Sequence, residues 1–310
     1  MTASVIGNGP GGRPRTRQAR IAGPSRLIDR RVNAIRSDLA DARLADVAIA
    51  PRYAEGVFQR CDVMVATLRS APAAGAVAVS ELLFGEAFAV FDVVSGDGGR
   101  WAWGQCLHDG YVGWVCADAL GAMGRAASHS VAVPAATVFA AADIKSPVVR
   151  TLPLNARLAV DAVAGDFVAV HGGFLSARHV APIGATSGDP VALALGFVGT
   201  PYVWGGRTRD GIDCSGLTQA VLGAAGVFCP RDSDQQAAAF ARIDPAARRR
   251  GDLVTFPGHV GILADADTLI HANAHWMATV VEPLAAVVAR LAASGMHRPP
   301  LTAASPCSAG

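Results

Sequence analysis

A cysteine at the start of an expected helix is the feature that most restricts how this chain can fold. Apolar residues recur at helical spacing in Leu217–Ala224, directly after Cys214, and this period predicts a helix. Asp213 precedes the cysteine and is a residue type that caps helix N-termini. The thiol would then lie in the first turn, where the positive end of the helix dipole favours thiolate and lowers the pKa of a cysteine. We therefore expect Cys214 to be a nucleophile.

A nucleophilic thiol needs a base, and two downstream histidines are candidates. His259 opens an apolar run after a Pro-Gly break, and His271 lies within the next apolar run. Strands rise about 3.3 Å per residue, so two antiparallel neighbours can hold such imidazoles side by side. We expect His259 to take the proton of Cys214 and His271 to orient His259 from behind. His275 has the same strand parity as His271, so parity alone leaves it as an alternative.

These motifs resemble the NlpC-type family of papain-like cysteine peptidases, which cleave peptidoglycan peptides. The matching segments, in chain order, are YVWGG, DCSGL, PRDSDQQ, RRGDLV, GHVGI and HA. The resemblance covers residues 187–290 and implies an α+β papain-like catalytic domain at 187–297. It implies Cys214, His259 and His271 as the catalytic residues. His271 is favoured over His275 because the third residue of the family pattern directly precedes an alanine.

The resemblance also implies residues that contact substrate. Tyr202 matches a tyrosine near the nucleophile, whose hydroxyl could donate to the oxyanion. Positions that contact the peptide in relatives with paired SH3-like domains are matched by Asp213, Ser215 and Ser233. The carboxylate of Asp213 can serve both as helix cap and as substrate contact. Arg231 and Asp232 could instead pair with each other and shape their loop.

Two segments before the catalytic region have the pattern of small all-β domains. In 61–122, apolar runs alternate with turns that contain Gly and Asp, and the stretch DGYVGWV resembles a hairpin of bacterial SH3-like domains. Residues 128–184 repeat this layout with fewer aromatic residues, and we interpret them as a second, degenerate SH3-like domain. The expected fold class is therefore an α+β papain-like domain preceded by two small all-β SH3-like barrels.

The two ends of the chain carry less information. Residues 1–60 are interpreted as a disordered N-terminal segment and lead-in, with a possible helical turn at 37–44, and 298–310 as an unstructured tail. Residues 1–26 contain no apolar run of signal-peptide length, and the six cysteines show neither metal-ligand nor disulfide spacing. These features predict a cytoplasmic protein. The net charge of +2 gives no argument for nucleic acid or membrane as a partner.

The expected function is a cysteine endopeptidase that recycles cell-wall peptides by cleaving γ-D-glutamyl-diamino acid bonds, the bond identity coming from the resemblance. In relatives with this layout the first SH3-like domain borders the cleft, and Tyr111 and either Glu81 or Glu86 match that position. A buried α-amine needs carboxylate partners, so we expect a preference for a free N-terminal L-Ala, held by Asp213 and one of these glutamates.

Other functions use the same features. A thiolate-dependent amidase or acyltransferase would share the chemistry, and a non-catalytic protein would bind ligand through its SH3-like domains. The intact Cys-His-His set argues against the last alternative. Thiol chemistry requires no cofactor or metal. The sequence predicts neither the accepted diamino acid nor the oligomeric state.

Overall fold

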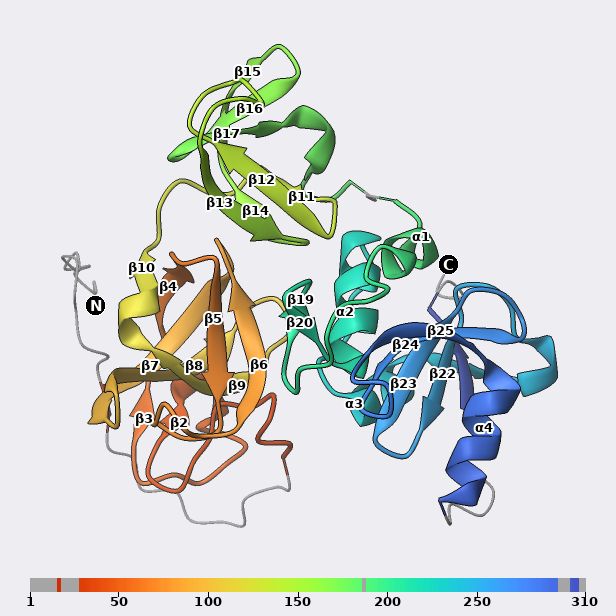
Figure 1. Cartoon of the computed structure of the whole chain (residues 1–310). Coiled ribbons are helices and arrows are strands. Elements are labelled where there is room, and N and C mark those ends of the chain that lie inside the picture. The colour runs from red at the N-terminus through yellow and green to blue at the C-terminus, as the bar shows by residue number, and fades with distance from the viewer. Residues whose placement is uncertain (1–15, 18–27, 186–187, 295–301, 307–310) are drawn as a thin grey trace. The chain divides into compact units, whose positions relative to one another are not determined.

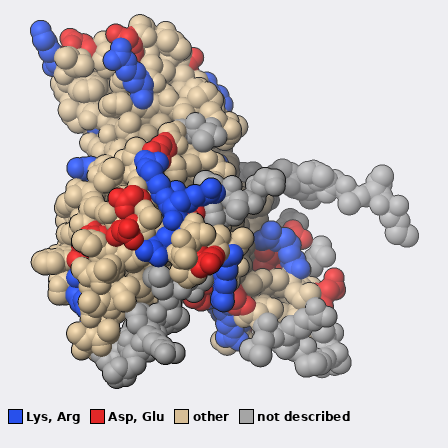
Figure 2. Space-filling model, turned by 90° about the vertical axis from the view of Figure 1, so that its right-hand side faces the viewer, with Lys and Arg blue, Asp and Glu red and all other residues tan. Residues whose placement is uncertain are grey.

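The computed structural model describes residues 16–17, 28–185, 188–294 and 302–306. They divide into two compact units, residues 1–125 and 126–310 (Figure 1). Among the described residues, no helix combines the length and apolar character that a membrane span needs. The face shown in Figure 2 carries basic and acidic side chains next to one another on a mostly uncharged surface, in keeping with the small net charge of +2.

A seven-stranded sheet forms the body of the first unit. Its strands are β4 (Val57–Cys61), β5 (Val65–Arg69), β6 (Ala78–Leu83), β7 (Ala87–Gly96), β8 (Gly99–Cys106), β9 (Val112–Cys116) and β10 (Leu120–Ala122), with the 3-10 helix η2 (Ala117–Ala119) before the last. Their spatial order is β10-β4-β7-β8-β9-β5-β6. Alternate side chains of β5 and β9 are buried, as expected for strands with one face on a core. The sheet begins at Val57, ahead of the expected boundary at residue 61.

The lead-in before this sheet is ordered and not helical at 37–44, apart from the 3-10 turn η1 (Ala42–Leu44). Strand β3 (Tyr53–Ala54) pairs in parallel with β2 (Ala40–Asp41) and antiparallel with β1 (Thr16–Arg17). The expectation of disorder is therefore wrong for β1, whereas β2 and β3 belong to the lead-in. The rest of 1–26 lies outside the described residues.

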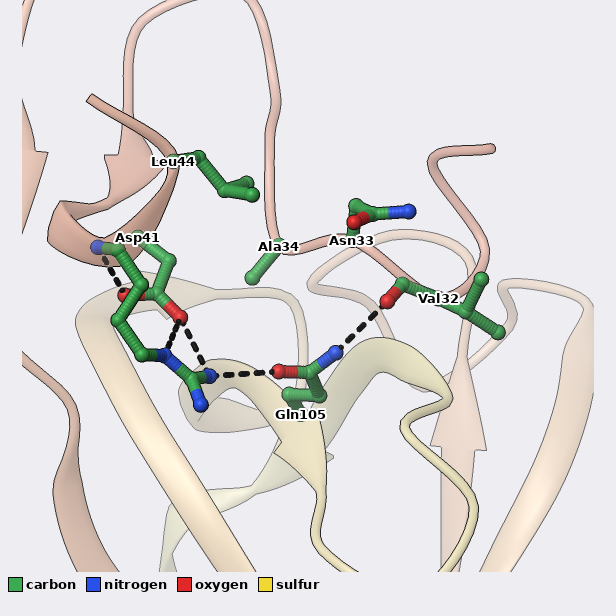
Figure 3. Close-up of a pocket in the computed structure, with 7 residues that line it drawn as sticks. Val32, Asn33, Ala34, Asp41, Leu44 and Gln105 are labelled. Carbon is green, nitrogen blue, oxygen red and sulfur yellow. Dashed lines mark hydrogen bonds and ion pairs between the residues drawn. The ribbon is translucent and has the colours of Figure 1, made fainter. Parts of the chain in front are cut away.

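Polar contacts join the lead-in to the sheet. A hollow of about 310 Å³ lies between them, and there Gln105 donates to the carbonyl of Val32 (2.9 Å) and accepts from Arg43 (3.1 Å) (Figure 3). The guanidinium of Arg36 lies 4.7 Å from the ring centroid of Trp103 and 5.1 Å from that of Trp114. A cation over an indole face is attracted by the ring quadrupole. These two tryptophans therefore take part in packing within the first unit.

Residues 129–182 open the second unit with two small sheets. One has the order β14-β11-β18, from β11 (His129–Val131), β14 (Arg157–Leu158) and β18 (Val180–Pro182). The other has the order β13-β12-β17-β16-β15, from β12 (Ala135–Phe139), β13 (Val148–Pro153), β15 (Val160–Ala164), β16 (Phe167–Val170) and β17 (Gly173–Ser176), and η3 (Ala177–His179) follows it. The interpretation of this region as a second SH3-like copy stays a prediction.

The remainder of the second unit is an α+β region. Its helices are α1 (Pro190–Leu195), α2 (Cys214–Ala224), α3 (Ser233–Ala239), η4 (Pro245–Ala247) and α4 (Leu284–Ala293). A six-stranded sheet follows the order β21 (Ala241–Ile243), β26 (Thr302–Ser305), β22 (Leu253–Phe256), β23 (His259–Leu263), β24 (Thr268–Asn273) and β25 (Ala278–Pro283). The short hairpin β19 (Arg207–Thr208) and β20 (Gly211–Ile212) precedes α2. Strand β26 corrects the expectation that the tail after residue 298 is unstructured.

Helix α2 is the central element of this region. Nearly all of its residues are buried, and it packs against β23 and β24. The preceding small-β region reaches it too, because Asn155 donates to the carbonyl of Ala220 (2.9 Å). At its N-terminal end α2 approaches the β19–β20 hairpin so closely that a Cβ on Gly216 would lie 2.2 Å from the carbonyl oxygen of Gly206. Only glycine fits at that point.

We expect Gly216→Ala to lower the free energy of unfolding by about 1–3 kcal/mol, because the new methyl group forces helix and hairpin apart. Gly223→Ala is the matched control in the same helix. There the nearest atom, the amide nitrogen of Asn155, lies 3.6 Å from the added Cβ, and replacing a helical glycine stabilises by roughly 0.5–1 kcal/mol. Urea unfolding followed by tryptophan fluorescence measures both. Equal effects of the two changes would contradict the close approach at Gly216.

Candidate active site

Cys214 is the first residue of α2 and is buried, with 6% of its surface exposed. The backbone N–H of Val260, next to His259, hydrogen-bonds to the thiol. Burial and the charge of Asp213 raise the pKa of Cys214 to about 11. This corrects the expectation of a lowered pKa, because removing the thiolate from water outweighs the stabilisation by the helix N-terminus. Cys214 is therefore a thiol in the substrate-free site.

The two predicted histidines lie side by side on β23 and β24. His259 Nε2 is 2.7 Å from His271 Nδ1. His271 is fully buried, and its Nε2 lies 2.8 Å from Oε1 of Glu282 on β25. Glu282 also accepts two hydrogen bonds of 2.8 Å from Arg290 of α4. His259 thus uses Nε2 toward His271, and Nδ1 is the ring nitrogen outside this contact.

Both histidines are neutral in this environment. Burial, and after it the neighbouring His271, lowers the pKa of His259 to about 3. Burial also lowers the pKa of His271, against the opposing effect of Glu282. With the thiol pKa raised and the imidazole pKa lowered, the proton rests on Cys214. The site therefore suits general-base catalysis, in which the proton moves to His259 as sulfur attacks.

His275, the alternative third residue, lies beyond the end of β24. Its side chain is exposed, and its ring contacts that of Trp276 at a centroid distance of 4.8 Å. His275 is not on the same strand as His271, because β24 ends at Asn273. The structure thus places His271 beside His259.

The sequence analysis missed Glu282. It lies at the end of β25, where Val280 is the cross-strand partner of His271. Two residues further, Glu282 lies diagonally across from His271 on the same face of the sheet. A carboxylate that interrupts an apolar strand was the available signal, but it identifies a partner only once the strand register is known.

Asp213 holds the start of α2 in place through a buried ion pair. Its two carboxylate oxygens accept from Arg231 at 3.0 and 2.7 Å, and further bonds come from the N–H groups of Gly216 (2.7 Å) and Gly205 (2.8 Å). Arg231 thus pairs with Asp213, and the side chain of Asp232 caps α3. Asp213 therefore already has Arg231 as a counterion, which a substrate amine would share.

The other predicted substrate residues of this unit have different environments. Ser215 is buried and accepts from Arg231 (2.9 Å). Ser233 opens α3 and is partly exposed. Burial, followed by the charges of Cys214 and Asp213, raises the pKa of Tyr202 to about 12. Its phenol therefore stays protonated and can donate a hydrogen bond near the thiol.

Glu86, Glu81 and Tyr111 lie in the first unit. Glu86 is 2% exposed and accepts from the backbone N–H of Leu83 (2.8 Å). Glu86 is therefore a buried carboxylate of the first unit. Tyr111 is buried with the core residues of the SH3-like sheet, and Glu81 is partly exposed on β6.

Three side chains in the first unit are of residue types that can bind a cation. The ligand atoms of Cys106, His108 and Asp109 lie within 4.8 Å of one another. Both ring nitrogens of His108 face carboxylates, with Nε2 3.0 Å from Asp109 and Nδ1 3.6 Å from Glu86. The contacts of His108 with these two carboxylates account for the clustering of the side chains.

Replacing Arg231 should be costly. We expect Arg231→Met to lower the free energy of unfolding by about 3–5 kcal/mol, since it leaves the buried Asp213 charge uncompensated. Arg250→Gln is the control, because Arg250 pairs with Asp189 at an exposed position and such pairs contribute about 0–1 kcal/mol. Urea denaturation compares the two. Similar losses for both variants would refute a structural role for the buried pair.

The neutral histidines also predict how stability depends on pH. The folded-state pKa of His259 is about 3 against its usual 6.5, so between these values the unfolded chain binds more protons. The free energy of unfolding should therefore fall as the pH drops below 6.5. His259→Gln should flatten this dependence, and His275→Gln, at an exposed position, should not. Urea midpoints at several pH values between about 7 and 5 test this, and an unchanged slope in His259→Gln would count against it.

Comparison with known proteins identifies two parts of the chain. Residues 199–287 match the model of the NlpC/P60 family, and residues 68–120 match that of the bacterial dipeptidyl-peptidase Sh3 domain. A solved NlpC/P60 family protein from Bacillus cereus ATCC 10987 aligns over 80% of this chain and 99% of its own, with a TM-score of 0.65 and 20% identity. At that identity the likeness shows the fold alone.

Curated relatives match over the catalytic region. The gamma-DL-glutamyl hydrolase of Bacillus subtilis is 38% identical over 112 residues, 33% of this chain and 27% of that protein. Dipeptidyl-peptidase 6 of Lysinibacillus sphaericus is 35% identical over 98 residues, 31% of this chain and 36% of that protein. The chain thus spans about a third of the length of these relatives. The predicted order of a β-rich SH3-like region followed by an α+β catalytic domain is confirmed: residues 68–120 match a bacterial SH3-like domain, and residues 199–287 match the NlpC/P60 family of cysteine peptidases.

Proposed function

We propose that this protein is a peptidoglycan endopeptidase that hydrolyses γ-D-glutamyl-diamino acid bonds in cell-wall peptides. The observation that carries the proposal is the arrangement of Cys214 at the N-terminus of α2 with His259 and His271 on the adjacent strands, 2.7 Å apart. The names of two relatives, gamma-DL-glutamyl hydrolase and dipeptidyl-peptidase 6, support this bond class and a short peptide substrate.

The reaction begins when Cys214 sulfur attacks the carbonyl carbon and His259 takes the thiol proton. The oxyanion that forms lies at the helix N-terminus, where the Tyr202 hydroxyl is a further donor. His259 then protonates the leaving amine, and a thioester remains on Cys214. A water molecule, deprotonated by His259, hydrolyses the thioester and restores the thiol.

Substrate selection is proposed to depend on a free N-terminal amine. Because Arg231 already pairs with Asp213, the carboxylate for this amine is assigned to Glu86 or Glu81 of the first SH3-like domain, and Tyr111 is assigned to the same subsite. The match of that domain to the dipeptidyl-peptidase Sh3 model supports this assignment. Such an enzyme would act on released peptides in the cytoplasm.

The test compares the free tripeptide L-Ala-γ-D-Glu-diamino acid, its N-acetylated form and purified sacculi. We expect hydrolysis of the free peptide, slow hydrolysis of the acetylated peptide, and loss of turnover by at least about 100-fold in Cys214→Ala and in His259→Ala. Product analysis by mass spectrometry distinguishes hydrolysis from acyl transfer.

Glu86→Gln and Glu81→Gln identify the amine partner, because only the correct one should raise the KM for the free peptide. Cys229→Ala is the control for Cys214→Ala, since Cys229 is also a buried cysteine but is not one of the proposed catalytic residues. Equal rates on free and acetylated peptide would contradict amine recognition. Efficient digestion of sacculi would overturn the recycling role, and full activity of Cys214→Ala would overturn the nucleophile.

A further inference from the structure

Glu282 is held at the far end of the histidine pair by contacts from two elements, β24 and α4. His271 of β24 lies 2.8 Å from its Oε1, and Arg290 of α4 reaches both carboxylate oxygens at 2.8 Å. Its side chain is 11% exposed and that of His271 is 1% exposed. A bidentate contact with a guanidinium fixes the orientation of a carboxylate as well as its charge. Glu282 is therefore rigidly placed behind His271.

The protons in this chain of groups follow from the chemistry of the acceptors. An ionised carboxylate can only accept, so His271 Nε2 must carry the proton between it and Glu282. A neutral imidazole then has its Nδ1 as an acceptor, and the proton in the 2.7 Å contact belongs to His259 Nε2. His259 Nδ1 is left without a proton. This nitrogen is the one that must take the proton of Cys214.

Asn273 opposes this arrangement. Its Oδ1 accepts from the backbone N–H of Trp276 (2.9 Å), which orients its Nδ2 toward His271 Nε2 at 3.2 Å. If Asn273 were the donor there, His271 would carry its proton on Nδ1. His259 would then carry its proton on Nδ1 and could not act as a base. The shorter distance and the negative charge of Glu282 favour the productive tautomers.

We propose that Glu282, clamped by Arg290, is a positioning residue that sets the tautomers of His271 and His259 and so makes His259 Nδ1 the base for Cys214. The proposal rests on the proposed role of His259. Glu282 and Asp213 favour a positive charge on His259, whereas His271 and Arg290 oppose it. Glu282 thus also offsets the charge that His259 gains during attack.

Glu282→Gln tests the proposal. Arg290 can only donate, so it should hold the amide oxygen of Gln and turn the amide N–H groups toward His271 Nε2. Both imidazoles would then adopt the unproductive tautomer. We expect kcat to fall roughly 10- to 100-fold with KM changed less than about twofold, because the base and not substrate binding is affected. Glu282→Asp keeps the charge and should recover part of the loss.

The tautomers themselves can be observed without substrate. In protein labelled with ¹⁵N-histidine, NMR should show Nε2–H tautomers for His259 and His271 in the wild type and Nδ1–H tautomers in Glu282→Gln. Because no peptide is involved, this readout stands even if the proposed bond specificity is wrong. A loss of activity without a change of tautomer would overturn the positioning role, as would Nδ1–H tautomers in the wild type.

Asp267→Asn is the matched control, since Asp267 forms an exposed ion pair with Arg248 elsewhere in this unit. It should leave both kcat and the histidine tautomers unchanged. If Glu282→Gln does not fold, Arg290→Gln loosens the same carboxylate from a more exposed position. It should lower kcat and mix the tautomers. Wild-type kcat with wild-type tautomers in a folded Arg290→Gln protein would contradict the clamp.

Discussion

The buried ion pair between Asp213 and Arg231 is the interaction on which the catalytic region depends. Asp213 caps α2, accepts from the N–H of Gly205 in the segment before β19, and accepts from both terminal nitrogens of Arg231. One carboxylate therefore joins the loop before the cysteine, the helix that begins with it, and the segment leading to α3. The position of the Cys214 thiol is fixed by this junction. A charge that the sequence suggests for substrate binding is largely used for structure.

Burial gives the site its resting state. A thiol with a raised pKa next to imidazoles with lowered pKa values holds its proton until a substrate arrives. A buried site favours the neutral forms of these groups, since a charged group loses more hydration free energy than a neutral one when it leaves water. The groups that can stabilise charge during the reaction lie at its edges. Val260 N–H contacts the sulfur, and Glu282 lies behind the histidines.

The hydrogen bonds of the site continue through the strands that pack against α2. Register places His271 opposite Val280 and brings Glu282 onto the same face two residues later. Helix α4 follows β25 directly, so Arg290 returns over the strand end to meet Glu282. Groups from β23, β24, β25 and α4 thus form one line of hydrogen bonds. The line depends on the sheet's register, because a one-residue slip would move each group to the other face.

Local patterns in the sequence determined the elements and the main reactive residues of this protein. Helical spacing after Cys214, the apolar runs that carry His259 and His271, and the turns of the first SH3-like domain all reflect neighbours in the chain. Contacts between distant segments were decided only by the tertiary structure. They include the pairing of Arg231 with Asp213, the placement of Glu282 behind His271, the pairing of Thr302–Ser305 with β22, and the raised pKa of Cys214. The physical reason is that burial and ion pairing depend on which surfaces meet, and a pattern read along one segment carries no information about what will cover it.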